Sequence, residues 1–261
     1  MRMWLISLLL LAPVVSQANV TVVPKVVQQG LWQDEACTAD AARAKESSCL
    51  CEADVTYIEI AGIPNADAIN ATIAKRATDA ISSLDNGGCS GKKITAAKDA
   101  DLPSHDQNDF AAKVDFENDA LLSISISGWW YGEGAAHGNP WADSMIIDKV
   151  TGKVLQASDI IGDLPAANRY IYDALKENTD TFLSSCGDDE NHYLPCPKEP
   201  KAYVADEKAI GYLAVDEKGL SVNFNVYAVG PYAVGAIDVA IPAKFVKYPA
   251  IKQLDGAKHA G

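Results

Sequence analysis

The strongest candidate for chemistry in this chain is His137, which follows the glycine-rich stretch GEGAA. A histidine that binds a metal needs further ligands at a regular spacing, and no second histidine lies nearby in the sequence. A general base needs a nucleophile or an orienting carboxylate, and Glu133 and Asp143 do not stand at a diagnostic spacing. We therefore interpret His137 as a residue that organises a turn or contacts a ligand, with Gly134 and Gly138 supplying unusual φ angles. Catalysis by His137 is the alternative.

Aromatic side chains surround this histidine in the sequence. Trp129 and Trp130 are consecutive in a predicted strand, so their side chains point to opposite faces and at least one leaves the main core. Tryptophan and tyrosine are common in cores and also dominate protein-binding and sugar-stacking surfaces. The candidate binding residues are Trp129, Trp130, Tyr131, His137, Trp141, Tyr227, Pro231 and Tyr232. We assign no catalytic residue.

Two other groups could be drawn as reactive sites. Cys186, His192 and Cys196 resemble a metal site, but cysteines in an oxidising compartment more often form a disulfide. Ser90 and Lys93 have the spacing of penicillin-recognising enzymes, yet the downstream partner motifs are missing from the sequence. We therefore expect no metal and no cofactor.

The first residues have the features of a secretory signal peptide. Arg2 precedes an apolar run from Trp4 to Val15, and Ser16-Gln17-Ala18 provides a small-x-small cleavage site. No later segment approaches the roughly 18 apolar residues that span a bilayer. We expect a signal peptide over residues 1–18 and a periplasmic or secreted protein that does not span the membrane.

The cysteines point to the same compartment. All six follow the expected cleavage site, and an even number in an exported protein favours disulfides. Cys186 and Cys196 are the simplest pair because they are close in sequence. The other four are expected to pair among themselves and to tie the N-terminal segment to the region around Cys89: Cys37, Cys49, Cys51 and Cys89.

The chain is acidic, with 22 Lys+Arg against 35 Asp+Glu and a formal net charge of −13. Nucleic acids and anionic membrane surfaces attract basic patches, so the composition argues against both as partners. An acidic surface favours a basic partner, or it serves solubility alone.

Alternating apolar and polar residues predict strands over 110–117 and 122–127, joined by a turn at Asn118-Asp119. Helical periodicity is found after Asn65, with Ile69, Ile73, Ala77 and Ile81 on one stripe, and again over 164–184. A short helix is expected at 40–45 and further strands at 19–27, 55–60, 144–148, 153–156, 202–205, 212–215, 220–227 and 237–241. This order predicts an α+β fold: a mainly antiparallel sheet with two principal helices packed on it, stabilised by disulfides.

Three stretches in the same order resemble one known family. They are YIEIAGIPNADAINATIAKRATDAI, the pair GEGAAHGN and IIDKVTGKVLQASDI, and VNFNVYAVGPYAVGAIDVAIP. Together they resemble the extracytoplasmic domain shared by the anti-sigma factor RsiV and the peptidoglycan deacetylase PdaC, where it is non-catalytic, and related to mycobacterial secreted antigens. We expect four segments: the signal peptide at 1–18, a cysteine-rich extension at 19–52, a domain at 53–250 that the resemblance assigns to this family, and a flexible tail at 251–261.

The resemblance implies an exported binding module at the bacterial cell wall rather than an enzyme. In RsiV-type proteins this domain binds lysozyme, so we expect a lysozyme-binding or lysozyme-inhibiting protein with a basic muramidase as its partner. Two alternatives stay open. One is a hydrolase or deacetylase that acts on peptidoglycan fragments through His137, and the other is an immunity protein that binds a periplasmic toxin.

Overall fold

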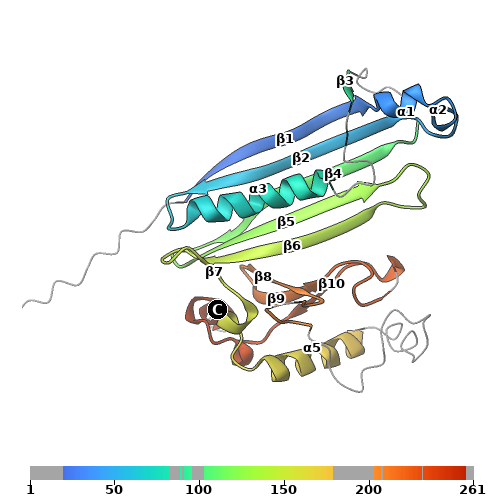
Figure 1. Cartoon of the computed structure of the whole chain (residues 1–261). Coiled ribbons are helices and arrows are strands. Elements are labelled where there is room, and N and C mark those ends of the chain that lie inside the picture. The colour runs from blue at the N-terminus through green and yellow to red at the C-terminus, as the bar shows by residue number, and fades with distance from the viewer. Residues whose placement is uncertain are drawn as a thin grey trace, which may run out of the picture.

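The computed structural model describes residues 20–82, 89, 91–95, 103–178, 203–206, 208–230 and 232–256. The predicted signal peptide, the pair Cys186–Cys196 and Pro231 lie outside the described residues. The fold is α+β, with a large, mostly antiparallel sheet above a smaller three-stranded sheet (Figure 1). No helix of the described part is both long and apolar enough to cross a membrane.

The large sheet has seven strands in the order β3-β1-β2-β4-β5-β6-β7. Adjacent strands are antiparallel except β2 and β4, which are parallel. The predicted turn between β4 and β5 is confirmed, and the Asn118 side chain accepts the N–H groups of Ala120 and Leu121 there. The strands are β1 Thr21–Gln33, β2 Leu50–Ala61, β3 Lys92–Ile94, β4 Asp106–Glu117, β5 Leu121–Tyr131, β6 Asn139–Asp148 and β7 Lys153–Val154.

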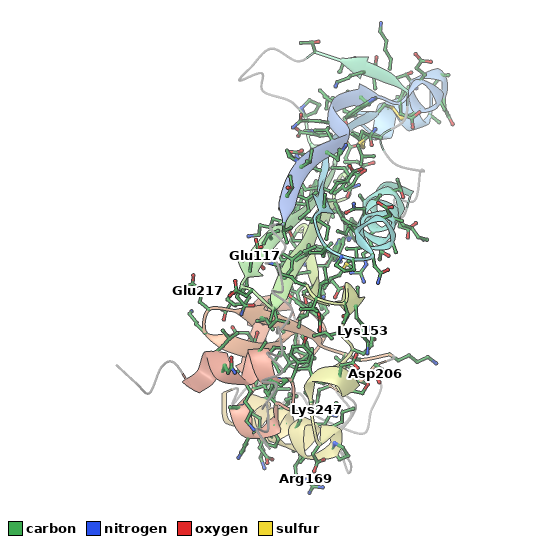
Figure 2. The ribbon with its side chains drawn as sticks, turned by 90° about the vertical axis from the view of Figure 1, so that its left-hand side faces the viewer. Glu117, Lys153, Arg169, Asp206, Glu217 and Lys247 are labelled. Atoms are coloured by element: carbon green, nitrogen blue, oxygen red, sulfur yellow. A yellow bond between two sulfur atoms is a disulfide. The ribbon has the colours of Figure 1, made fainter. Side chains whose placement is uncertain are left out.

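Helix α3, Ala66–Ser82, covers one face of this sheet. Its predicted apolar stripe is confirmed for Ile69, Ile73 and Ala77, which are buried against apolar residues of β2, β4 and β5. Burying an isoleucine side chain stabilises a fold by roughly 1.5–3 kcal/mol. Viewed edge-on, the opposite side of the upper strands carries none of the described helices (Figure 2).

The second part of the chain builds a second core around a sheet with the order β10-β9-β8, and Leu121 of β5 and Ile146 of β6 contribute to this core from the large sheet. Phe224 packs edge-on against Tyr203, with ring centroids 5.9 Å apart. The remaining elements are α4 Ala157–Ile160, α5 Leu164–Asn178, β8 Tyr212–Asp216, β9 Gly219–Phe224, η1 Tyr232–Val234, β10 Ile237–Ala240, η2 Ala243–Phe245 and α7 Pro249–Gly256.

The strand predicted at 202–205 is wrong for its described part. Tyr203 and Val204 are buried but lie in bends. The backbone of Val204 pairs instead with the side-chain amide of Asn168, which accepts the Val204 N–H at 2.9 Å and donates to its carbonyl at 3.1 Å. The apolar residues therefore predicted burial correctly, but the Asn168 side chain, and not a neighbouring strand, satisfies the Val204 backbone.

The boundaries expected at the two ends differ from the structure. The 19–52 segment contains β1 and the start of β2, which pair along their whole length, so it is part of the sheet rather than an appended extension. Between β1 and β2, the segment consists of the short helices α1 Glu35–Ala39 and α2 Arg43–Glu46 and their turns. At the other end, residues 251–256 lie in α7, where Ile251 is buried in the second core because it faces that core from the helix.

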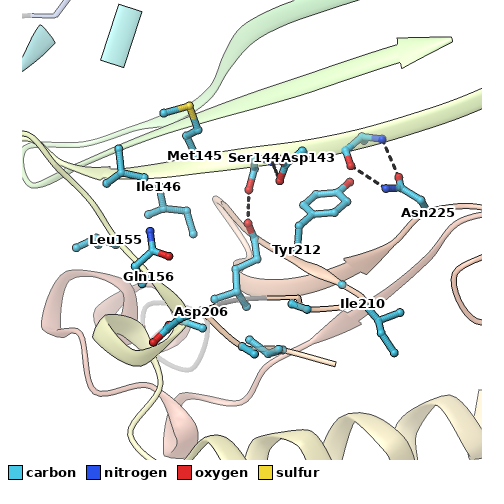
Figure 3. A pocket seen from close by; sticks show the side chains of 18 of the residues that line it. Asp143, Ser144, Met145, Ile146, Leu155, Gln156, Asp206, Ile210, Tyr212 and Asn225 are labelled. Carbon is cyan, nitrogen blue, oxygen red and sulfur yellow. Dashed lines mark hydrogen bonds between the residues drawn. The ribbon is translucent and has the colours of Figure 1, made fainter. Parts of the chain in front are cut away.

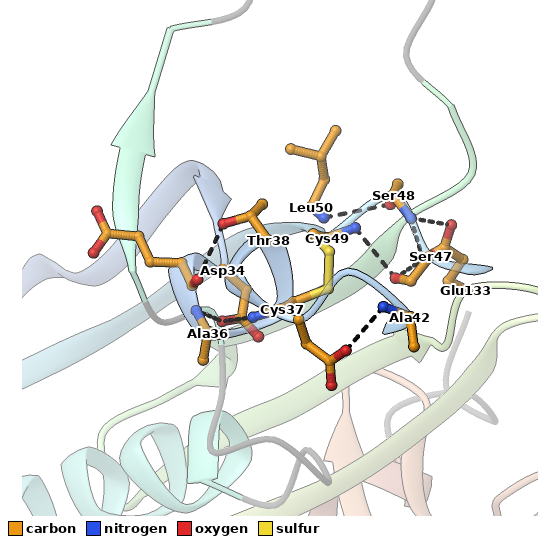
Figure 4. Close-up of a disulfide and its surroundings, with 12 residues drawn as sticks. Asp34, Ala36, Cys37, Thr38, Ala42, Ser47, Ser48, Cys49, Leu50 and Glu133 are labelled. Carbon is orange, nitrogen blue, oxygen red and sulfur yellow. Dashed lines mark hydrogen bonds between the residues drawn. A yellow bond between two sulfur atoms is a disulfide. The ribbon is translucent and has the colours of Figure 1, made fainter. Parts of the chain in front are cut away.

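The four remaining cysteines pair as Cys37–Cys49 and Cys51–Cys89. Their Cα atoms are 5.6 and 5.2 Å apart, within the usual range for disulfides. The expectation that these cysteines pair among themselves, with Cys89 joined to the N-terminal segment, is confirmed. Beside the first disulfide, the Glu133 carboxylate accepts hydrogen bonds from the Ser47 hydroxyl at 2.6 Å and the Ser48 N–H at 2.8 Å (Figure 4).

Asn225, directly after β9, joins the two parts of the molecule. Its side-chain amide accepts the N–H of Ala142 at 2.7 Å and donates to the carbonyl of Ala142 at 2.9 Å. Ala142 lies in β6, and among the described strands the two-residue β7 is the only one that pairs with its outer edge. The asparagine thus occupies the place of one residue of a neighbouring strand.

Replacing Asn225 with alanine should therefore weaken the fold. Both hydrogen bonds disappear, and the Ala142 backbone is left unpaired, so the free energy of unfolding should fall by roughly 1–3 kcal/mol. Urea denaturation followed by circular dichroism measures the change. Asn223→Ala is the matched control, because the Asn223 amide donates only a 3.3 Å bond to the Ser221 hydroxyl. Equal losses in the two variants would contradict the bridging role of Asn225.

Candidate functional site

The loop between β5 and β6 carries the candidate histidine. It begins with a turn in which the Ala135 N–H donates to the Gly132 carbonyl, and Gly134 has the expected positive φ of 81°. Gly138 departs from the expectation, since it is not among the residues with positive φ. A Cβ atom at Gly138 would overlap the indole of Trp129, so this glycine is needed for the close approach of a ring.

His137 is exposed, and both ring nitrogens have partners. Nδ1 lies 3.0 Å from the carbonyl oxygen of Gly138. Because a carbonyl can only accept, Nδ1 carries the hydrogen, and Nε2 of the neutral ring accepts from the Tyr227 hydroxyl at 3.2 Å. No carboxylate of the described residues hydrogen-bonds His137, and Glu133 is held by Ser47 and Ser48 instead.

Two tyrosines from the second part of the chain complete a cluster around this histidine. The Tyr232 ring stacks on the imidazole, with centroids 3.7 Å apart and planes 17° apart. The ring centroids of Tyr227 and Tyr232 are 5.6 Å apart. The backbone of Tyr227 has a positive φ of 66°, which is uncommon for a tyrosine. The structure therefore brings His137, Tyr227 and Tyr232 together; we call these three residues the His137 cluster.

The predicted tryptophans divide between the two faces of the large sheet. Trp129 and Tyr131 lie on the face opposite α3, stacked with ring centroids 6.1 Å apart. Trp130 points to the face that carries α3 and is 41% exposed. Trp141 packs beside Phe110, 5.9 Å away, in the space that Gly128 leaves free. Trp129 thus adjoins the His137 cluster through Gly138, whereas Trp130 and Trp141 lie apart from it.

An acidic row continues from Trp129 across the face of the large sheet opposite α3. The register places Asp54 beside Asp109, and Asp109 beside Trp129, on three neighbouring strands. Glu52 lies two residues before Asp54 on the same face, and all three carboxylates are exposed. We call Glu52, Asp54 and Asp109 the acidic row.

Partial desolvation raises the pKa of the Asp109 carboxyl above its ordinary value, and the neighbouring charges of Asp54 and Glu52 raise it further. Like charges side by side on adjacent strands destabilise a sheet. A cationic group of a partner would relieve this repulsion, and the ring of Trp129 offers a face on which such a group can lie.

The side chains gathered here can stack on aromatic rings, make cation–π contacts and form hydrogen bonds. Among the described residues, no group of three or more histidine, cysteine, aspartate or glutamate side chains is arranged to hold a metal ion. Sequence reasoning missed the acidic row because β2 and β4 are paired in parallel across an intervening helix, which local patterns do not reveal. It also missed Asn225, although this residue stands in the motif that carried the family resemblance.

Comparisons with known proteins place the fold but not the function. Residues 159–244 match the sequence model of a family described as "Protein of unknown function (DUF3298)". The matched segment runs from α4 through β8, β9 and β10 to η2. No curated protein matches the chain.

Two solved structures of DUF3298 family proteins share the fold. The protein from Pseudomonas aeruginosa PAO1 is 15% identical with a TM-score of 0.51, and the match covers 88% of this chain and 96% of that one. The protein from Bacteroides fragilis NCTC 9343 is 18% identical with a TM-score of 0.54, and the match covers 92% of this chain and 99% of that one. The likeness extends beyond the family match to both sheets, and at these identities it shows the fold alone.

The acidic row generates a prediction about stability and pH. Because the folded-state pKa of Asp109 lies above the ordinary value of 3.8, ionisation of this carboxyl destabilises the folded state. The destabilisation is absent below pH 3.8 and complete above the raised pKa. Asp109→Asn should therefore unfold at a higher urea concentration than the unmodified protein at pH 7, with a difference that vanishes in acid.

Urea titrations across this pH range measure the effect. Glu217→Gln, in the exposed turn between β8 and β9, is the control and should show no such pH-dependent gain. A stability loss in Asp109→Asn at pH 7 would contradict the repulsion within the acidic row.

Proposed function

We propose that this protein is an exported, non-enzymatic binding module that acts at the bacterial cell wall and binds a basic, lysozyme-like muramidase. The observation that carries the proposal is the His137 cluster, a partly exposed aromatic surface contributed by both parts of the chain and continued by Trp129 and the acidic row. The signal-like N-terminus and the disulfides support export. The motif resemblance to the RsiV and PdaC extracytoplasmic domain supports the choice of partner.

The proposed mechanism is occlusion of the enzyme's substrate cleft. Aromatic side chains held in fixed positions contribute contact area at low cost in conformational entropy, and tyrosine and tryptophan dominate the energetics of many interfaces. Tyr232 is fixed by stacking and His137 by two hydrogen bonds, so this surface is organised before a partner arrives. The net charge of −13 would speed the encounter with a basic enzyme.

An enzyme acting through His137 is the second candidate, and one observation favours it. The Nδ1–H bond to Gly138 leaves Nε2 as the basic nitrogen, directed at the hydroxyl of Tyr227. Loss of turnover of peptidoglycan fragments in His137→Ala, with an unchanged melting temperature, would establish this role. An immunity protein for a periplasmic toxin would use the same surface as the binding module, with a different partner.

The proposal predicts inhibition of a chicken-type lysozyme. An excess of the mature, oxidised protein should slow lysis of a cell-wall suspension at low salt, and added salt should weaken the effect because the encounter is electrostatic. Tyr232→Ala should reduce the affinity by about 2 kcal/mol, the value typical of an interface hot spot. Turbidity and calorimetric titration measure the two quantities.

Trp130→Ala is the matched control, because this exposed indole lies on the opposite face of the sheet. It should leave inhibition unchanged. Lysozyme that remains fully active at low salt with the protein in excess would rule out this partner. Binding that survives Tyr232→Ala but fails in Trp130→Ala would move the interface to the α3 face.

A further inference from the structure

A cavity of about 740 Å³ lies along the outer edge of β6, where the two parts of the chain meet (Figure 3). Its walls come from β6, from α3 through Thr72 and Arg76, and from the segment that leads into β8. This volume falls within the range of small-ligand sites. The Asn225–Ala142 pair lines the cavity, and none of the three residues of the His137 cluster is among its lining residues.

The backbone of β6 determines what this cavity can bind. Alternate residues of a strand direct both their N–H and C=O groups to the same neighbour. Ala142 directs its groups outward to Asn225, so Ser144 and Ile146 also direct theirs outward. The Ile146 carbonyl confirms this direction, because it accepts the N–H of Leu155 at 2.8 Å.

Two of these outward groups are left open within the described part of the chain. The Ser144 N–H donates to the carboxylate of its neighbour Asp143 at 2.7 Å. No described residue hydrogen-bonds the Ser144 carbonyl or the Ile146 N–H on this side of β6. Both residues line the cavity, and the rest of the edge is covered by Asn225 on one side and β7 on the other.

In a parallel pair of strands, one residue forms hydrogen bonds to two residues of its neighbour that are two positions apart. Its N–H donates to the carbonyl of the earlier residue, and its carbonyl accepts from the N–H of the later one. Addition of an extended peptide to a free sheet edge is a recurring mode of recognition. The acetamido group of a sugar contains one amide, so its N–H and C=O are too close together to pair with the Ser144 carbonyl and the Ile146 N–H at the same time.

We propose that this cavity binds an extended peptide, one residue of which pairs in parallel with the Ser144 carbonyl and the Ile146 N–H of β6. The side chain of that residue lies on the same face as Met145, next to Arg76 and Asp143, which form an ion pair at the rim. Its two neighbours in the peptide face the apolar wall of Leu155, Ile210 and Leu213. The site is separate from the muramidase-binding surface and does not depend on it.

The test uses the blocked tripeptide Ac-Ala-Leu-Ala-NH₂ and the same peptide methylated at the leucine nitrogen. Each is titrated into the ¹⁵N-labelled, oxidised protein, and amide resonances are followed by NMR. The first peptide should shift the Ser144 and Ile146 resonances in a saturable manner. The methylated peptide lacks the donor for the Ser144 carbonyl and should bind about tenfold more weakly.

Equal affinity for the two peptides would overturn the proposal, as would shifts centred on Tyr227 or the absence of saturable shifts up to the solubility limit. Shifts of Ser144 and Ile146 by free N-acetylglucosamine, but not by the peptide, would assign the cavity to sugars instead.

A protein variant tests the location independently. Ala209 lines the cavity, and Ala209→Trp should fill it and abolish peptide binding. Ala236→Trp, at an exposed position outside the cavity, is the control and should bind as the unmodified protein does. Unchanged binding by a folded Ala209→Trp protein would also overturn the proposal.

Discussion

The hydrogen-bonding requirement of the outer edge of β6 governs much of this structure. A sheet edge carries a row of N–H and C=O groups that must find partners in the protein or in water. β7 satisfies only the end of β6, and the Asn225 side chain satisfies Ala142. The side-chain amide of Asn225 is therefore one of the contacts that attach the second core to β6. The Ser144 hydroxyl, which donates to the Leu213 carbonyl, and the Tyr248 hydroxyl, which donates to the Asp148 carboxylate, are two others. Tyr227 and Tyr232 follow Asn225 in sequence, so this attachment also delivers them to His137.

The N-terminal segment contacts the loop between β5 and β6 as well. Glu133 lies in the β5–β6 loop that carries His137, and its carboxylate accepts hydrogen bonds from Ser47 and Ser48. The Cys37–Cys49 disulfide fixes those serines relative to β1 and β2. The loop is thus fastened at both ends, and this explains how exposed aromatic side chains can hold fixed positions. Such preorganisation lowers the entropy lost when a partner binds.

The parts of the fold that local patterns encode could be predicted. The β4–β5 hairpin and the stripe of α3 follow from periodicity, because each buries one face of a regular element. The strand predicted around Val204 is absent because the Asn168 side chain, from α5, hydrogen-bonds the Val204 backbone. The prediction that Gly138 has an unusual φ was wrong for a similar reason: the missing side chain serves here to give the Trp129 ring room to pack. In both cases the deciding contact joins residues that are far apart or on adjacent strands, which the sequence pattern does not contain.

The candidate site shows the same limit more sharply. The sequence predicted that Trp129 and Trp130 face opposite ways, because alternation is a property of a single strand. It did not predict that Asp54 lies beside Asp109, since the register of two parallel strands depends on the crossover between them. Exposed carboxylates in adjacent positions lower the stability of the free protein, and hydrophobic burial by α3 on the other face compensates for that loss. The two faces of the sheet therefore differ here: burial against α3 stabilises one face, and the opposite face carries the unfavourable charge of the acidic row.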